Sequence, residues 1–181
     1  MMPHPSEFYL PIGNFRPGQY EIAQAIAESP HRRIVVEGPP GSGKSIVALT
    51  AAQLWQARGG GAVNIATITK QLQRQYTGYG LPIVGTVWGR SGYECVRLGP
   101  PETCEGAPCS LVLEDEMFDE EQGACKFKAG GCHYYDAKFR ALYAPIRILN
   151  YHYFMATAHE FGYGKRSQSS PDTMLVCDES H

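Results

Sequence analysis

Short apolar runs alternate with amphipathic stretches along most of this chain. The spacing of apolar side chains predicts helices over residues 17–29, 44–58, 69–76 and 134–144. Runs of β-branched and apolar residues predict buried strands over residues 34–37, 63–67, 83–87, 146–149 and 173–177. Residues 1–15 are rich in proline and aromatic residues and are predicted to be an extended lead-in. Because strands that alternate with helices form a parallel sheet with helices on both faces, the pattern predicts an α/β fold.

This alternation stops between residues 89 and 133. Glycine, proline, cysteine and acidic residues dominate there, and apolar periodicity is lost. A segment of this kind is organised by ligands more readily than by a hydrophobic core. We therefore predict three parts: residues 1–88 as the first part of an α/β domain, residues 89–133 as an insertion, and residues 134–181 as the continuation of the α/β domain.

A phosphate-binding loop follows the first predicted strand. The sequence G-x-x-x-x-G-K-[ST] is matched in full by Gly38, Pro39, Pro40, Gly41, Ser42, Gly43, Lys44 and Ser45. Glycines let backbone N–H groups approach phosphate oxygens, and the helix that follows directs its positive end at the same anion. Lys44 is predicted to reach the β and γ phosphates of ATP, and the Ser45 hydroxyl to bind Mg²⁺.

A pair of acidic residues follows the last predicted strand. Phosphoryl transfer needs a group that holds the metal and a group that positions the attacking water. We predict that Asp178 holds Mg²⁺ and that Glu179 is the general base. Since ligands of parallel sheets bind at the carboxyl ends of the strands, the phosphate loop and these carboxylates are expected at one edge of the sheet.

Composition limits the classes of function. The chain has 181 residues, 43% of them hydrophobic, and a formal net charge of −2, which does not favour a strongly basic nucleic-acid binder. No apolar run approaches the roughly 20 residues that cross a bilayer, and the N-terminus lacks the pattern of a signal peptide. We expect a cytoplasmic protein that has no membrane partner.

Cysteine is concentrated in the insertion. Five of the six cysteines lie there: Cys95, Cys104, Cys109, Cys125 and Cys132. Clustered cysteines in a cytosolic protein indicate metal or cluster ligation rather than disulfides. Four thiolates suit a [4Fe–4S] cluster or a tetrahedral zinc ion, and the absence of paired C-x₂-C knuckles favours iron over zinc. The sixth, Cys177, lies in an apolar strand and is predicted to be a core residue.

Several motifs together resemble those of the XPD/DinG-like iron–sulfur helicases of superfamily two. Asp178-Glu179-Ser180-His181 is similar to the DEAH box, with serine in place of alanine. Arg16-Pro17-Gly18-Gln19 resembles an R-x-x-Q motif, and residues 67–75 resemble motif Ia. Gly89–Cys95 is similar to the beginning of the iron–sulfur domain, and Gly131–Tyr135 to its end, with His133 in place of proline. Residues 150–154 resemble the segment before the DEAH box.

The resemblance implies a RecA-like motor domain that hydrolyses ATP and moves 5′ to 3′ on single-stranded or forked DNA. It implies that Gln19 reads the adenine and that Thr67, Thr69 and Gln71 contact DNA phosphates, although Thr69 is also placed to cap a helix. Cys95 and Cys132 match the family's first and last ligands, Cys125 is the next candidate, and Cys104 and Cys109 compete for the remaining position. Four tyrosines could stack on bases, and we expect at least half of them to be core residues: Tyr134, Tyr135, Tyr151 and Tyr153.

A helicase of this family needs a second RecA-like domain, which these residues do not contain. The chain ends within a motif, at His181, so we expect a portion of a longer motor that binds nucleotide without unwinding DNA by itself. Two alternatives are a non-motor ATPase with a zinc-binding regulatory module and a nucleic-acid-binding module that has lost catalysis.

Overall fold

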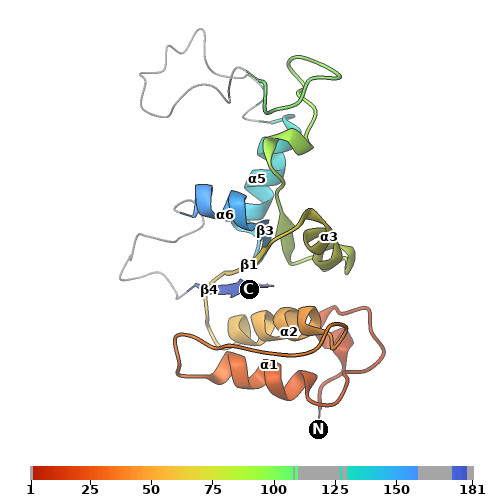
Figure 1. Cartoon of the computed structure of the whole chain (residues 1–181), viewed down its shortest axis with the longest axis vertical. Coiled ribbons are helices and arrows are strands. Elements are labelled where there is room, and N and C mark those ends of the chain that lie inside the picture. Colours follow the sequence, from red (N-terminus) through yellow and green to blue (C-terminus); the bar gives the residue numbers. More distant parts are fainter. Residues whose placement is uncertain (1, 108, 110–126, 128–129, 159–172, 179–181) are drawn as a thin grey trace. The chain divides into compact units, whose positions relative to one another are not determined.

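The computed structural model describes residues 2–107, 109, 127, 130–158 and 173–178. By its internal contacts the chain forms two compact units (Figure 1). The first unit comprises Met1–Val84 and Ala144–His181, and the second comprises Gly85–Tyr143. The functional boundaries predicted at residues 89 and 133 stay predictions.

The described residues form a parallel β-sheet. Its strands are β1 (Val63–Thr67), β2 (Val84–Thr86), β3 (Ile146–Asn150) and β4 (Met174–Cys177), in the order β2-β3-β1-β4. Strands β1, β3 and β4 lie in the first unit. In the register of the central pair Thr67 lies beside Asn150, and on the other side of β1 Ala66 lies beside Cys177. The parallel α/β fold predicted from the sequence is therefore confirmed.

Two helices that follow one another along the chain lie side by side. Helix α1 (Gln19–Glu28) packs along α2 (Lys44–Ala57), as Figure 1 shows. Apolar side chains of α2 reach the core, where Ile46 and Leu49 join Ile65 of β1 and Ile148 of β3. Burial of a side chain of this size contributes about 1.5–3 kcal/mol. This packing holds the first turn of α2, where the phosphate loop ends, against the sheet.

Helix α3 (Lys70–Gly78) and helix α6 (Tyr151–Thr157) both contact β1 and β3. Each begins with a side-chain cap. The Thr69 hydroxyl accepts a hydrogen bond of 3.2 Å from the backbone N–H of Leu72, and the Asn150 side chain accepts one of 2.7 Å from that of Tyr153. Helix α6 was not predicted from the sequence. It has few apolar positions, and it begins at Tyr151, directly after the last residue of β3.

The lead-in is more structured than the sequence predicted. A 3-10 helix, η1, spans Pro5–Phe8, and it is capped by His4. Phe8 and Leu10 are buried in the main core cluster, and Phe8 also packs edge-on against Phe15 with ring centroids 5.9 Å apart. The apolar side chains of the lead-in thus contribute to the core, which a purely extended segment would not do.

In the second unit, residues 93–104 form a narrow turn. The backbone N–H of Cys95 donates to the carbonyl of Glu102 (2.8 Å), and that of Cys104 donates to the carbonyl of Tyr93 (2.9 Å). The short helix η2 (Arg90–Gly92) precedes this turn, and helix α5 (His133–Tyr143) follows Cys132. Tyr134 and Tyr135 at the start of α5 are buried.

Two sequence predictions are wrong. Residues 34–37 form no strand, and Val35 is 94% exposed. Their β-branched side chains favour a strand, but a strand also needs a neighbour, and none pairs with this segment in the part of the chain that the structure describes. Cys177 is exposed rather than buried in the core, because β4 lies at the edge of the four-stranded sheet.

No described helix has the length and apolar character that a membrane span requires.

Candidate functional site

The phosphate loop turns sharply into α2 through two glycines with left-handed backbone. Gly41 has φ +76° and Gly43, the N-cap residue of α2, has φ +86°. Other residues adopt this conformation at a cost of about 1 kcal/mol or more. A Cβ atom on Gly43 would also collide with the side-chain amide of Gln19. Glycine is therefore required at Gly43 both by its backbone conformation and by the close approach of α1.

Arg16 and Gln19 bind the loop at two consecutive carbonyls. The Arg16 guanidinium donates a hydrogen bond of 2.6 Å to the carbonyl of Gly41, and Gln19 Nε2 donates one of 3.0 Å to the carbonyl of Ser42. Gln19 Oε1 accepts from the backbone N–H of Arg16 (2.9 Å), which fixes the amide orientation. Gln19 is 6% exposed. The R-x-x-Q motif thus shapes the loop, a role that the sequence did not indicate.

The Lys44 side chain bends back toward the phosphate loop. Lys44 Nζ donates to the carbonyls of Gly38 (2.8 Å) and Pro39 (3.3 Å). These carbonyls hold the cation at the mouth of the loop, in front of the first turn of α2. An anion bound there would meet both the ammonium group and the positive end of a 14-residue helix.

Ser45 and Asp178 come from distant parts of the chain and are joined by helix α3. Tyr76 donates a hydrogen bond of 2.9 Å from its phenol to Asp178 Oδ2. Gln75 Nε2 donates to Ser45 Oγ (3.3 Å). Burial, and then the carboxylate of Asp178, raise the pKa of Tyr76 above its usual range, so the phenol keeps its proton.

The backbone of Asp178 is fixed to the sheet. Its N–H donates to the carbonyl of Ala66 in β1 (2.9 Å), and its carbonyl accepts from the Tyr151 phenol (3.3 Å). Asp178 therefore lies where the carboxyl ends of the parallel strands meet, as the sequence predicted. The predicted general base, Glu179, lies outside the described residues.

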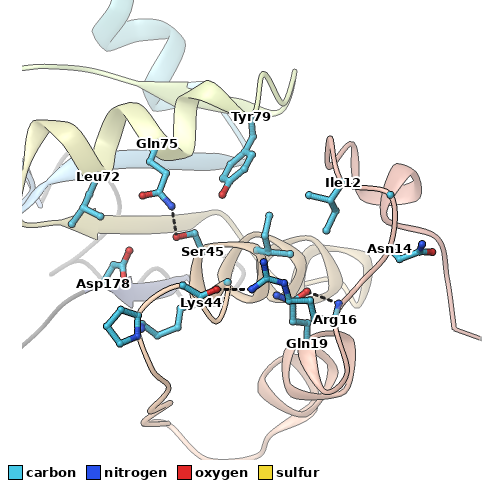
Figure 2. Close-up of a pocket in the computed structure, with 15 residues that line it drawn as sticks. Ile12, Asn14, Arg16, Gln19, Lys44, Ser45, Leu72, Gln75, Tyr79 and Asp178 are labelled. Carbon is cyan, nitrogen blue, oxygen red and sulfur yellow. Dashed lines mark hydrogen bonds between the residues drawn. The ribbon is translucent and has the colours of Figure 1, made fainter.

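A cavity of about 640 Å³ joins these groups. Figure 2 shows Asp178 at one end, Ile12 and Asn14 at the other, and Lys44 and Ser45 between them. Arg16, Gln19, Gln75 and Tyr79 also line it. Its volume falls in the range of about 300–1,000 Å³ that small-molecule sites occupy. A hydroxyl and a carboxylate that line one cavity are oxygen donors of the type that Mg²⁺ prefers, so the residues present fit a nucleotide bound with Mg²⁺.

Four of the five predicted cluster ligands are described, and they gather in the second unit. Cys95, Cys104 and Cys132 are buried, Cys109 is half-buried, and all four are free thiols. Burial, together with the neighbouring thiols of Cys132, Cys95 and Cys109, raises the pKa of Cys104 to about 12. Among the residues that the structure describes, no group of three or more side chains has the arrangement of metal ligands. Cys125 lies outside the described residues.

Arg90 connects this group of thiols to helix α5. Its guanidinium lies over the Tyr134 ring, 4.5 Å from the centroid, and donates to the Tyr135 hydroxyl (3.3 Å). It also approaches Cys109 Sγ at 3.9 Å. Sequence reasoning placed Arg90 inside a motif and gave it no role. Tyr134, Tyr135 and Tyr153 are buried, so the prediction that at least half of the four tyrosines are core residues is confirmed.

The three predicted DNA contacts differ in exposure. Thr67 is fully buried and its hydroxyl donates to the carbonyls of Thr69 (3.3 Å) and Leu149 (3.4 Å). Thr69 and Gln71 are exposed, and Thr69 caps α3. The capping role that the sequence left open is therefore observed, and only Thr69 and Gln71 present side chains to solvent.

Comparison with known proteins supports a P-loop domain. A family model described as an AAA domain matches residues 14–94, which contain the phosphate loop, α1, α2 and α3. The chain is 26% identical over 173 residues to a protein named 3'-5' exonuclease DinG from Staphylococcus haemolyticus (strain JCSC1435), an alignment that covers 83% of this chain and 19% of that protein. The chain thus spans about a fifth of the length of this curated relative. No solved structure matches the chain.

Proposed function

We propose that this chain is the ATP-binding part of an ATP-dependent DNA helicase. One observation carries the proposal: the phosphate loop, Lys44, Ser45 and Asp178 line a single cavity of about 640 Å³ at the carboxyl edge of a parallel sheet. The similarity to an AAA domain supports nucleotide binding, and the similarity to a protein named 3'-5' exonuclease DinG supports a nucleic acid as the partner.

Different residues of the cavity would bind the phosphates, the Mg²⁺ ion and the adenine base of the nucleotide. Backbone N–H groups of the loop and the Lys44 ammonium would bind the phosphates, and Ser45 with Asp178 would hold Mg²⁺. When bound, Mg²⁺ would neutralise charge on the phosphates as the terminal bond breaks. Glu179 would accept the proton of the attacking water. Gln19 uses one N–H and one oxygen lone pair within the protein, so one donor and one acceptor remain to read an adenine edge.

The thiols of the second unit are proposed to hold a [4Fe–4S] cluster. The donor set fits in type, since the free thiol of Cys104 has three other thiols as neighbours and thiolates bind iron strongly. Because Cys104 and Cys109 both join Cys95 and Cys132 in this group, we favour these four as ligands, with Cys125 as the alternative. Such a cluster would fix the fold of a segment that has few apolar contacts of its own.

Nucleotide binding is the first test. Purified chain should bind a fluorescent ATP analogue in the presence of Mg²⁺, and Lys44→Ala should weaken this binding at least tenfold. Lys70→Ala removes the same charge from an exposed position outside the cavity and should leave binding unchanged. Equal binding by Lys44→Ala and the unsubstituted chain would show that the loop is not the nucleotide site.

DNA binding and unwinding are tested separately. Single-stranded DNA should bind, and Thr69→Ala with Gln71→Ala should weaken binding, measured by fluorescence anisotropy. We expect no unwinding of forked duplexes by this chain alone. If nucleotide binds and single-stranded DNA neither binds nor stimulates ATP hydrolysis by a chain that includes a second motor domain, the non-motor ATPase becomes the better description.

A further inference from the structure

Helix α3 places two consecutive side chains against the predicted metal-binding groups. Gln75 Nε2 donates to Ser45 Oγ (3.3 Å), and the phenol of the next residue, Tyr76, donates to Asp178 Oδ2 (2.9 Å). Two consecutive residues of one helix thus each hold one of the two side chains that are predicted to bind Mg²⁺.

The position of the Tyr76 phenol is fixed by its surroundings. Tyr76 is 1% exposed and belongs to the main core cluster with Ile65 and Ile148. Helix α3 is also attached to the sheet by Gln73, whose Nε2 donates a hydrogen bond of 3.0 Å to the carbonyl of Ile148 in β3. Since the ring cannot swing away without opening the core, the hydroxyl is a fixed hydrogen-bond donor to Asp178.

We propose that Tyr76, assisted by Gln75, is a positioning residue that presets Ser45 and Asp178 as a pair for the Mg²⁺ of a bound nucleotide. This inference rests on the proposed nucleotide site and goes beyond it by assigning a role to α3. The phenol occupies one oxygen of Asp178 and so fixes the plane of the carboxylate, which leaves the other oxygen for the ligand. Gln75 donates to one lone pair of the Ser45 oxygen, which leaves the other lone pair for the metal.

Partners of this kind change metal affinity more than they change the fold. Loss of a group that orients a metal ligand typically lowers affinity about 10–100-fold. A residue that only fills space would act differently, because its loss would weaken nucleotide binding with and without Mg²⁺ by the same factor. The dependence of nucleotide affinity on Mg²⁺ therefore separates positioning from packing.

The test compares the unsubstituted chain with Tyr76→Phe, Gln75→Ala and the control Tyr9→Phe. Tyr76→Phe keeps the ring in the core and removes the hydroxyl, whereas Tyr9 is 56% exposed and lies outside the cavity. Affinity for a fluorescent ADP analogue is measured in EDTA and over a Mg²⁺ titration, and circular dichroism melting checks the fold. Mg²⁺ should increase the affinity for the ADP analogue, and the concentration that gives half of this increase is the quantity compared. We expect Tyr76→Phe to raise that concentration about tenfold or more and to leave the affinity in EDTA unchanged.

Gln75→Ala should raise the same Mg²⁺ concentration about threefold, because the Gln75–Ser45 bond (3.3 Å) is longer than the Tyr76–Asp178 bond (2.9 Å). Because Gln75 is exposed, its replacement should not disturb the core. Gln75→Ala therefore still tests the inference if Tyr76→Phe does not fold. The inference is overturned if the folded variants keep the Mg²⁺ dependence of the unsubstituted chain, or if they lose affinity equally in EDTA and in Mg²⁺. Failure of the unsubstituted chain to bind nucleotide in either condition would instead overturn the proposed function, and this inference with it.

Discussion

The side-chain amide of Gln19 donates a hydrogen bond of 3.0 Å to the backbone carbonyl of Ser42 in the phosphate loop. The same amide accepts from the backbone of Arg16, whose guanidinium holds the preceding carbonyl, that of Gly41. The start of α1 thus fixes two consecutive peptide groups of the loop. Since backbone N–H groups bind phosphate, fixing these peptides prepares the loop for its ligand.

Gln19→Ala should weaken nucleotide binding by about tenfold, because a partly buried carbonyl loses its donor at a cost of about 1–3 kcal/mol. Gln24→Ala is the matched control, as Gln24 lies on the exposed face of the same helix. The measurement is the affinity for fluorescent ATP and GTP analogues. An equal loss of affinity for ATP and GTP would indicate that Gln19 acts only through its contact with the loop. Loss of a preference for ATP over GTP would indicate that Gln19 also contacts the adenine base. Unchanged affinity for both would contradict either role.

Gly43→Ala should destabilise the protein and impair nucleotide binding. Alanine would meet both a strained backbone, at φ +86°, and the amide of Gln19. Gly59→Ala is a suitable control, since Gly59 has the same φ of +86° and no atom within 4 Å of an added Cβ. Urea unfolding should show a loss of about 1 kcal/mol for the control and about 1–3 kcal/mol more for Gly43→Ala. Equal losses in the two variants would show that the contact with Gln19 is unimportant.

Anaerobically purified protein should contain about four iron atoms and matching acid-labile sulfide per chain. Cys104→Ser should remove most of this iron, because Cys104 lies at the centre of the described thiols, whereas Cys177→Ser changes an exposed cysteine of the other unit and should not. If the protein instead contains one zinc per chain and no sulfide, and reconstitution with iron also fails, the cysteines form a zinc module rather than an iron–sulfur cluster. Iron retained in full by Cys104→Ser would leave Cys125 as the fourth ligand.

Arg90→Lys should destabilise the second unit by about 1–2 kcal/mol. Lysine keeps the charge, but it loses the planar group that lies over Tyr134 and donates to Tyr135. Arg97→Lys, at an exposed position of the same unit, is the control. Limited proteolysis should cleave the 89–133 segment faster in Arg90→Lys. The same cleavage rate in both variants would mean that the stacked guanidinium does not stabilise the unit.

Local sequence determined most of the helices and strands of this protein. Residues 63–67 have β-branched side chains at alternate positions, Val63, Ile65 and Thr67, and form β1 with the predicted bounds. The G-x-x-x-x-G-K-[ST] loop was recognisable because its function requires glycine, lysine and a hydroxyl at fixed spacing. These features depend on neighbours along the chain, so no tertiary information was needed to find them.

Pairing between strands was decided by the tertiary structure. Residues 34–37 have the composition of a strand, yet they are exposed and unpaired within the described part of the chain, because propensity cannot supply a neighbouring strand. Cys177 was predicted to be a core residue from its apolar surroundings in the sequence. Its exposure follows from the position of β4 at the sheet edge, and strand order is a property of the whole fold.

The sequence by itself predicted that Lys44, Ser45 and Asp178 belong to a nucleotide site, since each lies in a motif with a chemical requirement. Only the tertiary structure showed that Gln75 and Tyr76 of α3 contact Ser45 and Asp178, and that Arg16 and Gln19 shape the loop. A tyrosine inside an amphipathic helix has the same sequence pattern whether its hydroxyl meets solvent or a carboxylate. The physical reason is that motifs record local chemistry, whereas a hydrogen bond between distant residues exists only when the packing of helix on sheet brings its donor and acceptor together.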